Sequence, residues 1–172
     1  MAKNDNVLGV IKIGIGASGD GIMGASLTDF TDIELNSVNF AGAESNEETI
    51  PTESEDSYLT IGTAANPTTI TFRLFGVTGT AAVLLLGGEF SGSEYKAPES
   101  VPDNYLSIRL TSRTIGGFYH EIEMPYARIS ARHEGSITKS GLLAVEVTAT
   151  ANTPVSALAV KGAPYTIRKV AV

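Results

Sequence analysis

The alternation of apolar and polar side chains along short runs constrains this fold most. In residues 70–74, 106–110 and 118–124, apolar side chains gather at one parity and polar or charged side chains at the other. Successive side chains of a strand point to opposite faces of its sheet, so this period of two is typical of half-buried strands in antiparallel sheets. The chain is therefore predicted to be mainly β.

Several further segments favour one type of secondary structure. Four more strands are expected, at residues 32–38, 47–53, 127–132 and 142–149. Residues 80–86 are instead rich in helix formers, follow a threonine that can cap a helix, and end at Gly87-Gly88, a natural helix stop. We expect one short helix there, lying across a sheet.

The composition excludes several classes of protein. A length of 172 residues fits a single domain, residues 1–172. The absence of cysteine excludes disulfides, thiolate zinc sites and cysteine nucleophiles. With 12 basic and 19 acidic residues, the net charge of −7 argues against a protein that binds nucleic acid by neutralising phosphates. The first residues resemble neither a signal peptide nor a membrane span, so no membrane association is expected.

A strongly acidic segment spans residues 41–57 and contains no basic residue. Its acids are Glu44, Glu47, Glu48, Glu53, Glu55 and Asp56. A projecting acidic hairpin or long loop fits this composition, and so does an ordinary solvated surface loop.

The two ends of the chain are unusual in different ways. Residues 7–24 are rich in glycine, and residues 154–172 carry apolar side chains outside any obvious hairpin, among them Val155, Leu158, Val160, Tyr165, Ile167 and Val170. Apolar termini of this kind either pack on a neighbouring molecule or close the sheet of their own domain.

A formal match to the dinucleotide-binding fingerprint occurs at Gly14-Ile15-Gly16-Ala17-Ser18-Gly19, after a strand-like run. The fingerprint works where glycines bring a turn close to pyrophosphate at the start of a helix. Residues 20–25 contain two more glycines and have no helical periodicity. A flexible glycine-rich arm is the preferred interpretation, and no cofactor is expected.

Candidate catalytic groups are few. His120 shares its parity with apolar neighbours, which favours a core histidine, and His133 adjoins a turn. Glu121 and Glu123 share one face of a strand, as a catalytic carboxylate pair would, but exposed acids on an outer face are much commoner. No second ligand completes a zinc motif, so we expect neither an enzyme nor a metal site.

A small basic patch is expected from Arg128 and Arg132, which share one strand face, together with Lys139 beyond the turn. Such a patch opposite the acidic segment would fix the register between subunits of an assembly. Scattered surface charge is the alternative.

Taken in order, these features resemble the tail tube (major tail) proteins of bacteriophages and related contractile injection particles. The similarity covers about residues 27–152. It rests on the ordered set Thr31–Leu35, Thr69–Leu74, Val83–Gly88, Tyr95–Pro98, Glu121–Ala131, Lys139–Leu142 and Val145–Thr150.

The resemblance implies a pair of packed β-sheets, sandwich-like or barrel-like, with a flanking helix. It implies six-membered rings that stack into a tube with a β-barrel lumen. By position, residues 41–57 would be the loop that reaches the next ring, and residues 1–26 an N-terminal arm. Residues 153–172 would be a C-terminal arm or a closing strand.

The resemblance also implies partners and a location. The subunit would form homo-oligomers in the virion tail, assembled in the host cytoplasm. It would meet tape measure, tail terminator and baseplate or tail-tip proteins, and in some particles a sheath. Genomic DNA would pass through without specific binding, repelled by lumen acids. The candidates for these acids are Glu34, Glu121, Glu123 and Glu146.

A different class of protein also fits the strand pattern. A β-sandwich binding module, such as a virion decoration protein or a carbohydrate-binding domain, would show the same alternation.

Overall fold

The long strand β10, Phe118–Glu134, joins two halves of one large sheet. The computed structural model describes residues 7, 9–139 and 141–172. The eight-stranded sheet has the order β2-β1-β9-β10-β11-β6-β3, and β12 pairs with β10 outside this order. Its other strands are β1 Val10–Ala17, β2 Thr28–Phe30, β3 Asn39–Ala41, β6 Thr69–Phe75, β9 Asn104–Ser112, β11 Ala144–Ala151 and β12 Thr166–Ala171. Every pairing is antiparallel, as the alternation predicts.

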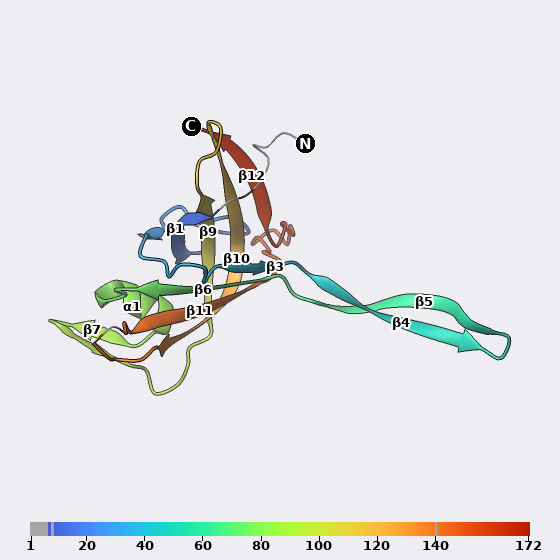
Figure 1. The fold of residues 1–172 in the computed structure, drawn as a ribbon, viewed down its shortest axis with the longest axis horizontal. Helices are drawn as coiled ribbons and strands as arrows, with labels where there is room; N and C mark the ends of the chain where they lie inside the picture. Colours follow the sequence, from blue (N-terminus) through green and yellow to red (C-terminus); the bar gives the residue numbers. More distant parts are fainter. Residues whose placement is uncertain (1–6, 8, 140) are drawn as a thin grey trace.

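Along one edge, β10 changes its neighbour. Residues 118–123 pair with β12, and residues 127–134 pair with β11. A bulge in the pairing with β9 lies between Met124 and Ala127, next to Pro125, which has no N–H to give to the ladder. Strands β6 and β11 run across β9 and β12 in Figure 1. The sheet is thereby folded into two layers.

The hydrophobic core lies between these layers. One layer contributes the buried side chains of Ile13, Ile15, Ile108, Leu110 and Met124, and the other those of Ile70, Phe72, Leu74 and Val147. The helix α1, Gly79–Leu86, adds Ala82 and Leu85 to this core. The predicted fold class is confirmed: the protein is mainly β, with packed antiparallel sheets and one short flanking helix.

The helix ends where the sequence predicts. Its C-cap, Gly87, has a φ of 73° and donates its N–H to the carbonyl of Val83. Its N-cap is Thr78, but the hydroxyl makes no capping hydrogen bond, so that detail of the prediction is wrong. A small hairpin of β7, Glu89–Ser91, and β8, Glu94–Lys96, follows the helix and contacts it.

Most predicted strands are present. Residues 70–74 and 106–110 lie in β6 and β9, and residues 118–124 and 127–132 are parts of the single strand β10. The strand predicted at 142–149 starts at Ala144 and continues to Ala151.

The strand predicted at residues 32–38 is wrong. Only Ile33 forms a bridge to β6, and a turn follows. The hydroxyl of Ser37 donates to the carbonyl of Glu34 at 2.7 Å and accepts the backbone N–H of Arg73 at 3.1 Å. This side chain takes the place of a strand partner, which is why the alternating segment turns instead of extending.

The interpretation of residues 1–26 as a terminal arm is wrong for the part that the structure describes. Residues 10–17 form β1, which lies between β2 and β9, and Ile13 and Ile15 are completely buried. Apolar side chains at alternate positions anchor this segment in the core. Residues 1–6 and 8 of the expected arm lie outside the described part of the chain.

The glycines of the fingerprint have a packing role. A Cβ on Gly16 would lie 2.2 Å from the carbonyl oxygen of Ser26, and one on Gly14 would lie 3.2 Å from the side chain of Leu27. They let residues 26–27 fold closely over β1. The next element is the antiparallel strand β2, so the helix needed for pyrophosphate binding does not follow.

The C-terminal segment closes the sheet. Strand β12 pairs with residues 118–123 of β10, which selects the closing strand from the two interpretations of residues 153–172. Residues 153–165 form a loop with one bridge between Val155 and Lys161.

Candidate functional site

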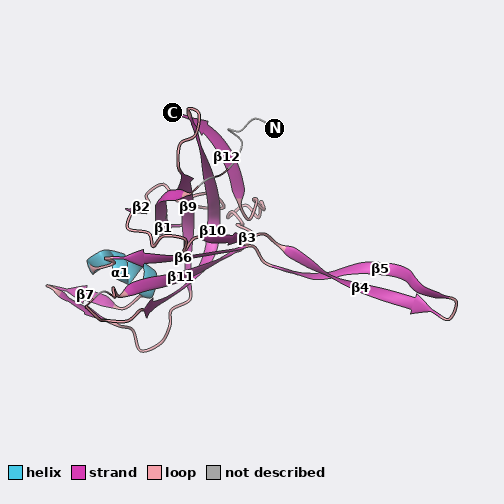
Figure 2. Cartoon of the chain, in the orientation of Figure 1, coloured by secondary structure: helices cyan, strands magenta, loops and turns pink. Residues whose placement is uncertain are grey.

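A two-stranded hairpin projects far from the layered body (Figures 1 and 2). Its strands are β4, Glu44–Thr52, and β5, Glu55–Asn66. The acidic segment predicted at 41–57 therefore covers only the first strand, the turn and the start of the second. Strands β4 and β5 pair with each other in a separate sheet, and every side chain of β4 is exposed.

The hairpin has two chemically different faces. Opposed residues in an antiparallel pair share a face. The pairs Glu48–Ile61 and Ile50–Leu59 therefore form one face. Its three aliphatic side chains, Ile50, Leu59 and Ile61, are 41%, 48% and 39% exposed. This set is called the apolar face.

Among the paired residues 47–50 and 59–62, those on the opposite side are polar residues and a glycine. Thr49 and Thr60 are paired, with their hydroxyl oxygens 3.3 Å apart, and Glu47 stands opposite Gly62. The six predicted acids, Glu44, Glu47, Glu48, Glu53, Glu55 and Asp56, are all exposed. None of them forms an ion pair within the described part of the chain. The hairpin thus carries almost all of the net charge of −7.

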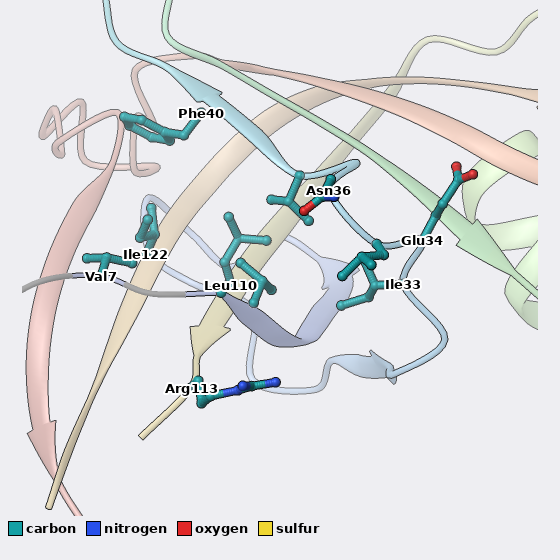
Figure 3. Close-up of a pocket in the computed structure, with 12 residues that line it drawn as sticks. Val7, Ile33, Glu34, Asn36, Phe40, Leu110, Arg113 and Ile122 are labelled. Atoms are coloured by element: carbon teal, nitrogen blue, oxygen red, sulfur yellow. The ribbon is translucent and has the colours of Figure 1, made fainter. Parts of the chain in front are cut away.

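An apolar groove of about 370 Å³ lies between residues 33–40 and strands β1, β9 and β10 (Figure 3). It is lined by Val7, Gly9, Val10, Ile33, Glu34, Leu35, Asn36, Val38, Phe40, Leu110, Arg113 and Ile122. The carboxylate of Glu34 points away from the apolar side chains in Figure 3. This groove is called the mouth groove.

The predicted lumen acids are all paired with arginines. Glu121 and Glu123, on β10, are only 7% and 9% exposed, so the expectation that they are exposed is wrong. Arg168 of β12 donates to Glu121 at 2.7 Å, and Arg109 of β9 donates to Glu123 at 2.8 Å. The hydrogen bond with Glu121 and the nearby charge of Glu123 raise the pKa of Arg168 above its usual value.

The other two lumen candidates lie on the other layer. The guanidinium of Arg73 lies 2.7 Å from Glu34, and Arg132 donates to Glu146 at 2.7 Å. The core lies between the layers, so the two sets of acids are on opposite outer faces. One lumen wall can include Glu121 and Glu123, or Glu34 and Glu146, but not all four.

The predicted basic patch is neutralised within the chain. Arg128 makes two hydrogen bonds to Asp103, the shorter at 2.8 Å, and these raise the pKa of Arg128. Arg132 bonds to Glu146 and Glu134, which raises its pKa as well. Only Lys139, exposed in the loop after β10, has no such partner in the part of the chain described here. The patch does not form a free basic surface.

The catalytic candidates do not converge. His120 is buried at 8% exposure, as predicted, and its backbone N–H donates to the hydroxyl of Ser112. The ring of His133 contacts that of Tyr95, with centroids 6.3 Å apart. Among the described residues there is no group of three potential metal ligands. In the same residues, no helix has the length and apolarity that a membrane span requires.

No protein-family model and no curated protein matches this sequence. The functional assignment of the hairpin and the mouth groove therefore rests on their own geometry and chemistry.

Sequence reasoning missed half of the hairpin and all of the groove. Leu59 and Ile61 lie beyond residue 57, although their separation by Thr60 already carries the period of two. The sequence contains no pattern that predicts the groove, because the lining comes from four separate segments that only the folded chain brings together.

Proposed function

We propose that this protein is a structural subunit that polymerises into a tube of the phage tail type. Rings of six copies would stack through the hairpin, and DNA would pass through the lumen. The observation that carries the proposal is the hairpin β4–β5, which projects from the body with an exposed apolar face. The resemblance of residues 27–152 to tail tube proteins supplies the form of the assembly.

The exposed apolar face gives the hairpin a physical reason to bind a partner. An isolated two-stranded hairpin is at best marginally stable in water. Burying an exposed aliphatic side chain contributes about 1–2 kcal/mol, since part of each side chain is already covered. Contact of Ile50, Leu59 and Ile61 with another subunit would therefore order the hairpin and stabilise the assembly.

The charge distribution is compatible with a conduit for DNA. The outer faces of both layers carry acids paired with arginines, so neither face presents an unopposed basic surface to phosphates. The acids of the hairpin, repeated around a ring, would repel DNA within a Debye length of roughly 10 Å. DNA would then slide without adhering.

One observation favours the second candidate, a carbohydrate-binding module. The rings of Tyr105 and Tyr126 are stacked, with centroids 5.0 Å apart, and Tyr126 lines a groove of about 340 Å³ beside Pro154. Aromatic rings next to a groove are a common sugar platform. Titration with oligosaccharides separates the candidates: a response that Tyr105→Ala abolishes would favour the module over the tube.

The direct test is electron microscopy of the purified full chain and of a variant without the hairpin. In the variant, residues 45–65 are replaced by Asn-Gly, which makes a tight two-residue turn between Glu44 and Asn66. The full chain is expected to form rings or tubes, and the variant a folded monomer. Tubes from the variant, or a monomeric full chain at every concentration, would overturn the proposal.

A further inference from the structure

We propose that the mouth groove receives the apolar face of the hairpin from a second copy of the chain. This inference rests on the proposed function and adds the surface that the hairpin binds. Three observations support it. Both surfaces are apolar, each carries one charged residue that has no ion-pair partner among the described residues, and the hairpin extends too far from its own groove to enter it.

The groove lies against the hydrophobic core and is rimmed by exposed apolar side chains. Its floor includes Leu110 and Ile122, which belong to the buried core, and its walls include Val38 and Phe40. At the rim, Leu35 is 86% exposed. The exposed side chains of Leu35 and Val7 leave apolar surface in contact with water, so a partner that covers them gains the free energy of burial.

The apolar face matches this lining. Ile50, Leu59 and Ile61 stand together on one side of a narrow two-stranded ribbon, which can enter a groove that a globular surface could not. The polar side, with Thr49 and Thr60, would then remain in water. This orientation explains why the paired residues 47–50 and 59–62 place apolar and polar side chains on different faces.

One charge on each surface completes the match. Among the described residues, Arg113 is the only basic one that lines the groove, and it forms no ion pair with any of them. Glu48 is the only charged residue paired with the apolar face, and it too is unpaired there. The other charged residue of the groove, Glu34, is already bound to Arg73. Docking would bring Glu48 to Arg113.

The hairpin cannot reach the groove of its own chain. Phe40 lines the groove, and the chain leaves it along β3 toward the hairpin. Ile50 lies ten positions further on, about 33 Å away at the rise of a strand. A hairpin that enters this groove must therefore come from another copy. Such a contact joins two different surfaces, so it can repeat from copy to copy, into a closed ring or an open filament.

Charge reversal tests the contact with a matched control. Arg113→Glu is expected to raise the concentration needed for assembly about tenfold, because it places two acids together. Adding Glu48→Arg should restore assembly. Adding Glu47→Arg instead makes the same charge change on the polar side and should not. Equal rescue by both second substitutions, or by neither, overturns the inference.

Disulfide formation gives an independent readout, because the natural chain contains no cysteine. A variant with Ile50→Cys and Leu35→Cys should form a ladder of linked copies when oxidised. A control with Ile50→Cys and Leu158→Cys, also highly exposed but outside the groove, should not.

The outcomes separate the two proposals. Assembly without the Ile50–Leu35 ladder and without rescue by Glu48→Arg overturns the groove as the receiving surface, and leaves tube formation standing. A wild-type chain that never assembles overturns both. Linked copies together with rescue by Glu48→Arg support both.

Discussion

Arg168, on the C-terminal strand β12, donates a hydrogen bond of 2.7 Å to Glu121 on β10 and lies 3.4 Å from Glu123. Both carboxylates are nearly buried, while the arginine is about half exposed. One side chain of β12 thus partners two acids of β10.

Replacing this arginine should loosen the closing strand. Arg168→Ala is expected to lower the free energy of unfolding by about 1–2 kcal/mol, less than the roughly 3–5 kcal/mol of a fully buried pair, because solvent screens the exposed guanidinium. Urea denaturation measures the loss. In a background of Glu121→Gln and Glu123→Gln the same substitution should cost much less, and an equal cost in both backgrounds would contradict this account.

The sequence predicts the positions of the strands in the body better than the contacts that their outward-facing side chains make. Alternation located β6, β9, β10 and β11, because each has one face on the core and one outside. It failed for Glu121 and Glu123, since the arginines that cover them come from β9 and β12, and cross-strand partners are not visible in the order of residues.

The glycine content of residues 10–17 predicts a flexible segment, whereas these residues form the ordered strand β1. Glycine-rich segments are usually flexible, but Gly14 and Gly16 alternate with the buried side chains of Ile13 and Ile15. The need for glycine came from residues 26–27 folding over the strand, a contact that depends on the tertiary structure. The run of acids in the sequence predicts a hairpin. The apolar face is not visible there, because it depends on which residues of β4 and β5 are paired.

A substitution at Gly16 tests the placement of β1. Gly16→Ala should destabilise the protein by about 1–3 kcal/mol, because the new Cβ would overlap the backbone of Ser26. Gly42→Ala, where no atom lies within 4 Å of the new Cβ, should change stability by less than about 0.5 kcal/mol. Thermal unfolding compares the two, and equal effects would show that β1 is not packed as described.

Lowering the pH should remove the stabilising contribution of the Glu146 carboxylate on the outer face of β11. Hydrogen bonding to Glu134 and then to Arg132 lowers the pKa of Glu146 below its usual 4.5. A lowered pKa in the folded state means that this carboxylate contributes stability above pH 4.5, which is lost as the pH falls through the folded value.

Glu146→Gln should remove that contribution. The difference in free energy of unfolding between wild type and variant is expected to be constant at neutral pH and to shrink below pH 4.5. Denaturant unfolding across this range measures it. A difference that grows as the pH falls would contradict the assigned direction.

Sedimentation velocity of two hairpin variants tests the central claim, that the apolar face drives assembly. One variant changes the apolar face, with Ile50→Ser, Leu59→Ser and Ile61→Ser, and the other changes the polar side, with Thr49→Ala and Thr60→Ala. The wild type and the polar-side variant should sediment as large assemblies, and the apolar-face variant as a folded monomer. Assembly of the apolar-face variant at the wild-type concentration would contradict the claim.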